Sequence, residues 1–384
     1  MSKPMFGDGF STVVASAIRV MGDRLILVGV SSDENVHPVG RWSRTTLFGK
    51  TCDFFPVIST AKINKKYIKN LAFTLRLMWF WGEITAKTSE NVITQNYMIM
   101  WWLSRSRRFS RRIFYFPGLG NQMLIGRKPV LGKFLYGLYE IINFSCLAKM
   151  DLVIAAASEN ELDDFRKTWQ AYLKDKPIYQ LPTAVDITFF APQPDIARLK
   201  HKYGIEKDTV HFVCVGRLAR VKGIDFLIDA LQEFNKKYTH ARLLVVGDGE
   251  ERESLQQYVV AERLGQDVIF FGNVPPGEVR DIVNSADLCI VGSSFEGFSC
   301  AMVEQIACGK PLVSTDVSGA SEIIDDGQNG FIVKNREPQE FATYMYKALN
   351  LREAGTKSRE LAVNKYSEEA IWERFLSLLE SPVG

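Results

Sequence analysis

Two glutamates eight positions apart, Glu296 and Glu304, are the residues of this chain best placed to hold a polar ligand. Glu296 lies in a loop that follows an apolar run at 288–291, which predicts a strand. Glu304 falls about one turn into the helix that comes next, and Ser299 can cap the start of that helix. Because free N–H groups and the helix dipole favour negative charge there, the pattern predicts an anion site with an acid on either side.

A second loop supplies positive charge. Residues 216–223, Gly-Arg-Leu-Ala-Arg-Val-Lys-Gly, follow a strand-like run at 211–215. Arg217 can bind two phosphate oxygens at once, and Lys222 adds a mobile point charge. Taken alone, two such cations are more often surface charges; together with the glutamate segment they indicate a phosphate clamp.

Composition limits the classes of protein. The chain has 384 residues, 46% of them hydrophobic and 24% charged, which fits two globular domains. No apolar run reaches the roughly 18 residues of a transmembrane helix. Six scattered cysteines without a Cys-x-x-Cys pair indicate reduced thiols, so we expect a cytoplasmic protein with no metal site.

Charge is divided unevenly along the chain. The number of Lys and Arg residues minus the number of Asp and Glu residues is 25 − 14 = +11 over residues 1–185. Over residues 186–384 it is 22 − 30 = −8, and the two values sum to the net charge of +3. A basic first half predicts an anionic partner for that half.

The second half has the regular pattern of a parallel sheet. Strand-like runs alternate with amphipathic helix-length segments through short loops that contain glycine. The runs are 211–215, 243–246, 268–270, 288–291, 312–314 and 331–333. This α/β pattern predicts a Rossmann-like domain, whose ligands bind beyond the carboxyl ends of the strands.

The first half has a weaker pattern. Residues 10–21 indicate a helix, and 25–30, 113–116 and 152–156 indicate strands. The segment 181–192 has two prolines and a β-rich middle, as expected of an interdomain crossing. We therefore expect an N-terminal domain at 1–185, a C-terminal domain at 186–366 and a terminal helix at 367–384.

The segment 294–311 resembles the E-x7-E motif of retaining GT-B glycosyltransferases, in particular family 4, the glycosyl transferases group 1. The resemblance implies two Rossmann-like domains with a cleft between them and a C-terminal helix that crosses back. It assigns the donor sugar's hydroxyls to Glu296 and the nucleotide ribose to Glu304. The helix N-terminus at Gly297, Phe298 and Ser299 would face the donor's diphosphate.

Other motifs fit the same resemblance. Residues 216–223 match the G-R-x-x-x-x-K-G element, which makes Arg217 and Lys222, with Glu296, the expected catalytic residues. Further donor contacts are expected at Gly216, Gly249, Val274, Gly9 and Asn121. For Gly249, in a Gly-Asp-Gly turn, a tight turn without ligand is an equally good interpretation.

Two features depart from the family. The turn at 117–121 has no histidine where the family often has one, so Asn121 or the turn's backbone would take part of that role; a turn without chemistry is as good an interpretation. Only six residues precede the loop that contains Gly9, which predicts either a start upstream of Met1 or a first strand shortened to residues 3–6.

The acceptor side carries two basic and aromatic runs. Five arginines crowd into 105–112 after the apolar run 97–103, and four lysines at 62–69 precede Phe73 and 79–81. This composition favours peripheral association with an anionic membrane, on the inner face of the cytoplasmic membrane. The alternative, core tryptophans with solvated arginines, stays open; a nucleic acid partner is disfavoured by the other motifs.

The resemblance implies a retaining glycosyltransferase that moves a sugar from a nucleotide diphosphate sugar to a glycan or lipid-linked acceptor, in bacterial surface polysaccharide or lipopolysaccharide synthesis. No cofactor or metal is expected. Two alternatives remain: a GT-B sugar-nucleotide epimerase and a non-catalytic GT-B nucleotide-sugar-binding protein.

Overall fold

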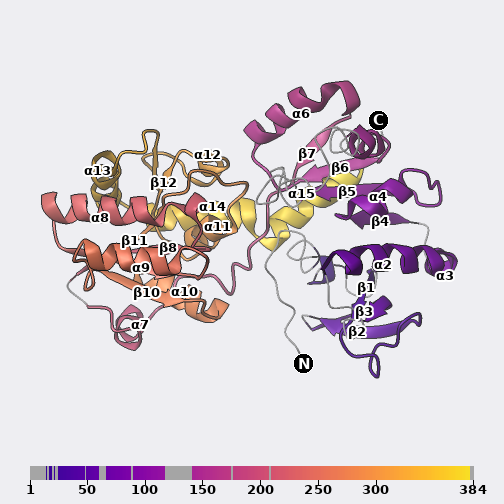
Figure 1. Ribbon diagram of the computed structural model, residues 1–384, viewed down its shortest axis with the longest axis horizontal. Helices are drawn as coiled ribbons and strands as arrows, with labels where there is room; N and C mark the ends of the chain where they lie inside the picture. Colours follow the sequence, from indigo (N-terminus) through magenta and orange to yellow (C-terminus); the bar gives the residue numbers. More distant parts are fainter. Residues whose placement is uncertain are drawn as a thin grey trace. The chain divides into compact units, whose positions relative to one another are not determined.

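The computed structural model describes residues 25–47, 49–59, 66–87, 90–116, 141–173, 176–206 and 209–380, with a few positions between 14 and 21 (Figure 1). The chain divides into two compact units. Unit 1 takes Met1–Ala156, Leu162–Leu181 and Trp372–Gly384; unit 2 takes Ala157–Glu161 and Pro182–Ile371.

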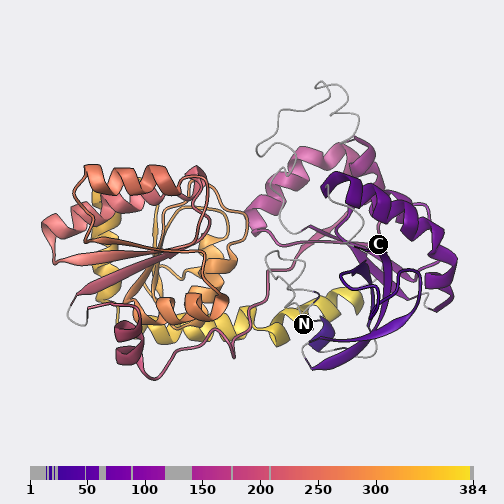
Figure 2. The same ribbon diagram turned by 60° about the horizontal axis from the view of Figure 1, so that its bottom comes forward.

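Unit 2 contains a six-stranded sheet in which every pair of neighbours is parallel, in the order β10-β9-β8-β11-β12-β13. The strands are β8 Val210–Val215, β9 Ala241–Val246, β10 Val268–Gly272, β11 Leu288–Val291, β12 Leu312–Thr315 and β13 Gly330–Val333. All six predicted strands are therefore confirmed, with ends that differ by at most two residues. Figure 2 shows this sheet with helices on both sides.

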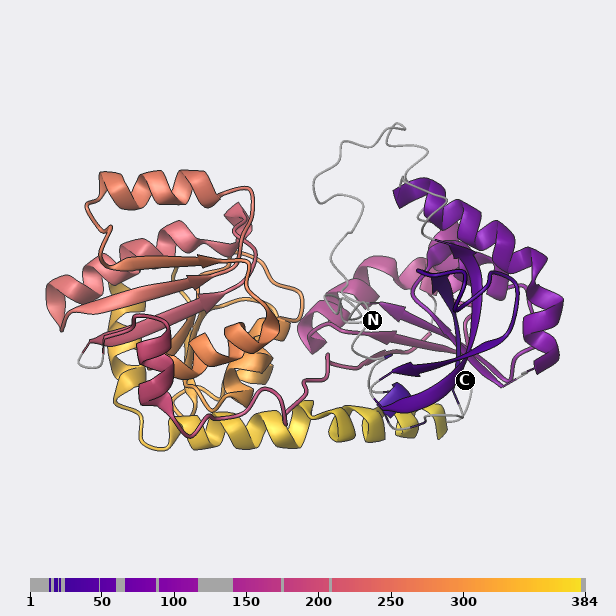
Figure 3. The same cartoon turned by 90° about the horizontal axis from the view of Figure 1, so that it is seen from below.

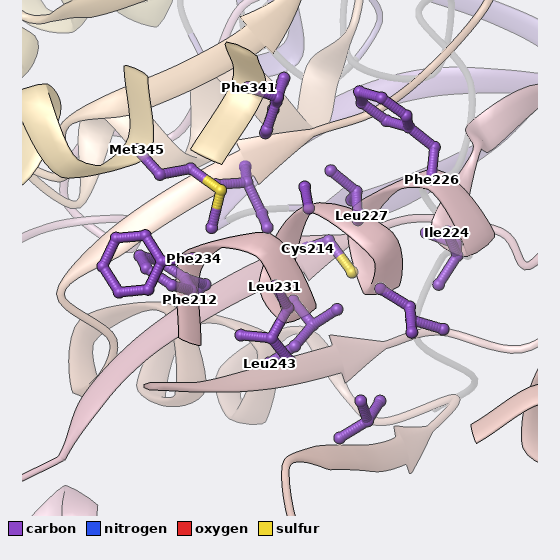
Figure 4. Close-up of a cluster of buried hydrophobic side chains, with 14 of the residues drawn as sticks. Phe212, Cys214, Ile224, Phe226, Leu227, Leu231, Phe234, Leu243, Phe341 and Met345 are labelled. Carbon is purple, nitrogen blue, oxygen red and sulfur yellow. The ribbon is translucent and has the colours of Figure 1, made fainter. Parts of the chain in front are cut away.

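One face of the sheet is covered by α8 (Ile224–Lys237), α9 (Arg252–Ala261) and α13 (Pro338–Leu349). The strands are apolar on both faces, as expected of a sheet covered by helices twice. Phe212 packs edge-on against Phe234 of α8, and Phe226 of α8 does the same with Phe341 of α13 (Figure 4). The first pair joins α8 to the sheet, and the second joins α8 to α13.

The opposite face is covered by α10 (Pro276–Ser285), α11 (Cys300–Ala307), α12 (Ala320–Ile323) and α14 (Ala354–Tyr366). Met302, Val303 and Ile306 of α11 are fully buried, which confirms the predicted apolar stripe of that helix. The remaining elements of unit 2 are α7 (Ile196–Lys202) and a short 3-10 helix, η3 (Arg220–Lys222).

Unit 1 holds two sheets whose described strands are not hydrogen bonded to each other. The first has the order β1-β3-β2, with β2 antiparallel, and the second has the parallel order β4-β5-β6-β7. The strands are β1 Ile26–Ser31, β2 Ser43–Leu47, β3 Lys50–Ser59, β4 Asn91–Thr94, β5 Arg111–Phe116, β6 Leu152–Ala155 and β7 Ile178–Gln180. The β2–β3 hairpin was not predicted, because its strands mix polar and apolar residues without strict alternation.

The helices of unit 1 include α2 (Lys66–Trp79), α3 (Trp81–Lys87), α4 (Tyr97–Leu103) and α6, Glu159–Leu173, whose first residues belong to unit 2. Figure 3 shows the purple helical segment that contains α2 at one side of the unit 1 strands. Between residues 10 and 21 some described positions are helical, and the rest of that predicted helix lies outside the described residues.

The terminal helix α15 (Glu368–Glu380) begins in unit 2 and ends in unit 1. Arg374 donates a hydrogen bond of 3.1 Å to the Gln180 side chain, and Arg111 donates one of 3.5 Å to the Leu378 carbonyl. Both contacts attach the end of the helix to the sheet of β4–β7.

Among the described residues, no helix is both long and apolar enough to span a membrane. All six cysteines are free thiols, as expected, and five of them are buried.

Candidate functional site

The order of the unit 2 sheet reverses between β8 and β11. From β8 the chain proceeds outward to β9 and β10, whereas from β11 it proceeds the other way to β12 and β13. In open α/β sheets, ligands bind at such a point, beyond the carboxyl ends of the strands. The two polar loops found in the sequence are the loops that follow these two strands.

Lys222 and Glu296 meet at this point. The Lys222 Nζ lies 2.6 Å and 2.7 Å from the two carboxylate oxygens of Glu296, so the ammonium bridges both. Glu296 is 8% exposed, while the Lys222 side chain retains 27% of its surface. The pair thus presents its cation to the outside and keeps its carboxylate inside.

A second donor holds the same carboxylate. The Ser293 hydroxyl donates to Glu296 Oε1 over 2.6 Å, and Ser293 is itself buried. The Thr315 hydroxyl at the end of β12 donates to the Ser293 carbonyl over 2.7 Å. Three adjacent strand ends therefore orient Glu296. We did not predict Ser293 or Thr315; a serine three residues before a glutamate at a strand end was the only signal in the sequence.

The close approach of the two loops requires a glycine at 223. Its φ is +60°, and a Cβ there would lie 2.2 Å from the Gly292 carbonyl oxygen. The Ser294 N–H donates to the Val221 carbonyl over 2.8 Å, which joins the loops through their backbones. Only glycine combines this left-handed conformation with such contact, and the contact brings Lys222 to Glu296.

Glu304 lies on α11 with its carboxyl enclosed by protein. Burial raises the pKa of this carboxyl to about 7, and no charged or hydrogen-bonding group of the described chain offsets it. Nevertheless Glu304 as a whole residue retains some exposed surface, whereas Gln305 beside it is fully buried. A carboxyl that is desolvated, without a partner among the described residues and still open on one side is suited to accept hydrogen bonds from a ligand.

The start of α11 differs in one respect from the sequence prediction. Ser299 occupies the N-cap position with extended backbone, but its side chain makes no capping hydrogen bond. The predicted cap by the Ser299 hydroxyl is therefore wrong. The N–H groups of the first turn stay available to an anion, since the cap that would have satisfied them is not made.

Arg217 does not join the Lys222–Glu296 pair. Its side chain is 66% exposed and lies 3.7 Å from Glu250 in the next loop. A solvated contact of this kind contributes little to stability, so the guanidinium is free to exchange its partner for a phosphate.

The remaining predicted positions are placed as follows. A Cβ on Gly249 would lie 2.4 Å from the Leu218 carbonyl oxygen, so packing alone requires this glycine. A Cβ on Gly216 or Gly297 would meet open space. Phe298 packs against Tyr366 at 5.7 Å between ring centroids, and Val274 is half-buried after β10.

Gly9 and Asn121 lie outside the described residues, as does the 117–121 turn. The four histidines are all described, and those of unit 2 lie away from the site. His211 is buried near the start of β8, His240 directly precedes β9, and His201 lies in the last turn of α7. His211 and His240 thus lie at the opposite ends of the strands from Glu296, so neither serves it as a base.

Part of the chain is similar in sequence to known proteins. Residues 195–368 match the family model "Glycosyl transferases group 1". The chain is 33% identical over 171 residues to a GDP-mannose-dependent phosphatidylinositol monomannoside mannosyltransferase of Mycolicibacterium smegmatis, covering 42% of this chain and 44% of that protein. It is 31% identical over 220 residues to a D-inositol 3-phosphate glycosyltransferase of Corynebacterium jeikeium, covering 53% and 52%. The chain thus spans about half the length of the curated relatives it matches.

Solved structures resemble the whole chain in fold. A sucrose-phosphate synthase from Thermosynechococcus elongatus superposes with a TM-score of 0.72 at 18% identity, covering 96% of this chain and 92% of that one. Anabaena HepE in complex with UDP gives a TM-score of 0.71 at 19% identity, covering 100% and 98%. The chain has the GT-B fold, and its residues 195–368 match the glycosyl transferases group 1 family model.

Proposed function

We propose that this protein is a retaining glycosyltransferase that uses a nucleotide diphosphate sugar as donor. The observation that carries the proposal is the Lys222–Glu296 pair at the reversal of strand order, held by Ser293 and followed by the open first turn of α11. Such a site offers positive charge for a diphosphate and a fixed carboxylate for sugar hydroxyls side by side.

In this proposal each residue has one task. Glu296 accepts hydrogen bonds from the donor sugar, and Glu304 accepts them from the ribose. Arg217, Lys222 and the α11 N-terminus stabilise the charge that develops on the leaving diphosphate. The leaving phosphate itself takes the proton of the acceptor hydroxyl, so the reaction needs neither a histidine base nor a required metal.

We assign the acceptor to unit 1 and propose that it is a glycan or a lipid-linked sugar of a bacterial surface polysaccharide or lipopolysaccharide. The basic balance of residues 1–185 supports an anionic acceptor. The names of relatives support the class: one mannosyltransferase acts on a phosphatidylinositol mannoside, and a Staphylococcus aureus relative on poly(ribitol phosphate).

The test is incubation of the full chain with UDP-, GDP- and ADP-sugars, since relatives or neighbours are named for GDP-mannose and UDP. We expect slow release of the nucleotide diphosphate from one donor, and faster release when an acceptor extract is added. Addition of EDTA should leave the rate unchanged, and NMR of the product should show the donor's anomeric configuration. C2 epimerisation of the donor, or binding without any turnover in the presence of acceptors, would overturn the proposal.

A further inference from the structure

Helices α2 and α4 in unit 1 each expose large apolar side chains, where a globular protein is normally polar. On α2 the exposed fractions are 58% for Leu75, 41% for Met78 and 84% for Trp79. Their spacing of three and four positions puts all three on one side of the helix, opposite the buried Leu77. An exposed tryptophan beside two other large apolar side chains is an interaction surface rather than a scattered exception.

Helix α4 packs against α2 and exposes apolar side chains of its own. Met98 is 39% exposed and Trp101 is 44% exposed, whereas Met100 and Leu103 on the other side of α4 are fully buried. The Arg105 guanidinium lies 4.1 Å from the centre of the Trp101 ring and donates to the Trp101 carbonyl. We call the exposed side chains Leu75, Met78, Trp79, Met98 and Trp101 the α2/α4 face.

Positive charge predominates in the sequence around the α2/α4 face, where Glu83 and Glu90 separate two stretches without acidic residues. Residues 54–82 contain five Lys or Arg and no Asp or Glu. Residues 91–139 contain eight Lys or Arg and again no Asp or Glu. Among the described cations of these stretches, Arg76, Arg105, Arg107 and Arg108 are exposed.

Not every arginine that the sequence suggested for this role is available. Arg112 donates through two nitrogens to the carboxylate of Asp151, each at 2.8 Å. Burial alone would raise the pKa of Asp151, but the hydrogen bonds and charge of Arg112 lower it instead. Arg111 reaches the carbonyl of Leu378. These two arginines stabilise the fold, and the exposed ones are left for a partner.

We infer that the α2/α4 face docks this protein on a membrane leaflet rich in anionic phospholipids. Apolar and aromatic side chains enter the boundary between head groups and acyl chains, while the surrounding arginines contact phosphates. A nucleic acid would satisfy the charge but not the apolar side chains, and a folded acidic protein would not select a face so free of hydrogen-bonding groups. Membrane docking itself does not depend on the proposed function. Its consequence does rest on that function: the acceptor is drawn from the same leaflet.

The test is sedimentation of the full chain with lipid vesicles of phosphatidylcholine alone and of phosphatidylcholine mixed with phosphatidylglycerol. We expect the protein to pellet with the mixed vesicles, and to dissociate as salt is raised. Replacing Arg76 and Arg107 by Gln should weaken the partition by about 25-fold, at about fivefold per charge. The matched control replaces Arg352 and Lys365, exposed cations of unit 2, by Gln and should partition like the unmodified protein.

The apolar part is tested by Trp79→Ala, which should weaken partition to the mixed vesicles by about tenfold or more. Val260→Ala, at a 73% exposed site in unit 2, is its control and should have no effect. Equal binding to both kinds of vesicle, no binding to either, or unchanged partition of both the Arg76/Arg107 and Trp79 variants would overturn the inference. Binding of UDP or GDP, measured without vesicles, should be the same in all variants, so a failure of docking is distinguished from a failure of the nucleotide site.

Discussion

Glu304→Gln should make the unliganded protein more stable at alkaline pH while weakening its hold on the nucleotide. Burial raises the pKa of the Glu304 carboxyl from 4.5 to about 7. The unfolded chain therefore releases this proton at lower pH than the folded chain does. Below about pH 4.5 the carboxyl is protonated in both states and does not lower the stability of the fold. As pH rises from there through about 7, the free energy of unfolding falls.

The difference between the two pKa values corresponds to a cost on the order of 3 kcal/mol once the carboxyl is ionised. Glutamine has the same shape and no charge, so it removes this cost. In urea denaturation we expect Glu304→Gln to exceed the unmodified protein by about 1–3 kcal/mol at pH 8 and to equal it at pH 4. Glu360→Gln, an exposed position of α14, is the control and should change stability by less than about 0.5 kcal/mol at either pH.

The same substitution should act in the opposite direction on binding. If the ionised carboxylate accepts hydrogen bonds from a ribose, UDP or GDP affinity measured by calorimetry should fall as pH drops below about 7. The variant should bind more weakly at pH 8 and lose that part of the pH dependence. A variant that is less stable at pH 8, or that binds nucleotide as well as the unmodified protein, would refute the reasoning.

Three further predictions concern the loops at the sheet. Lys222→Met should destabilise the protein by about 1–3 kcal/mol, because it leaves the buried Glu296 carboxylate short of a partner, and adding Glu296→Gln should recover part of this in a double-mutant cycle; simple additivity would contradict the pair. Ser293→Ala should lower kcat about tenfold with nucleotide affinity unchanged, since it removes the 2.6 Å hydrogen bond that orients Glu296, and Ser293→Thr should rescue it. Gly247→Ala should cost at least about 3 kcal/mol in denaturation, because its φ is +137° and a Cβ would lie 1.8 Å from a carbonyl oxygen of the β8 loop. Gly297→Ala, where a Cβ meets open space, should fold normally and impair donor binding alone. If the Gly247→Ala and Gly297→Ala variants were equally stable, the predicted steric clash at Gly247 would be contradicted.

Much of unit 2 could be predicted from the sequence because its information is local. Each buried strand is a short apolar run bounded by a glycine loop, and each helix has its own apolar stripe. Lys222 and Glu296 are marked by fixed spacing from strand ends, so their loops could be assigned to one edge of the sheet. Unit 1 was less predictable because its β2–β3 hairpin mixes polar and apolar residues, and because the pairing of its strands depends on contacts far apart in sequence.

Local sequence determined which residues can carry charge, where the strands of the second half begin to within two residues, and that this half forms a parallel sheet. Tertiary structure alone decided three things: that Lys222 bridges both oxygens of Glu296, that Glu304 is desolvated enough for its pKa to reach about 7, and that Arg112 is committed to Asp151. The physical reason is that distance, burial and partner choice are set by side chains brought together from distant segments. An exposed lysine and glutamate at the same distance would contribute little to stability.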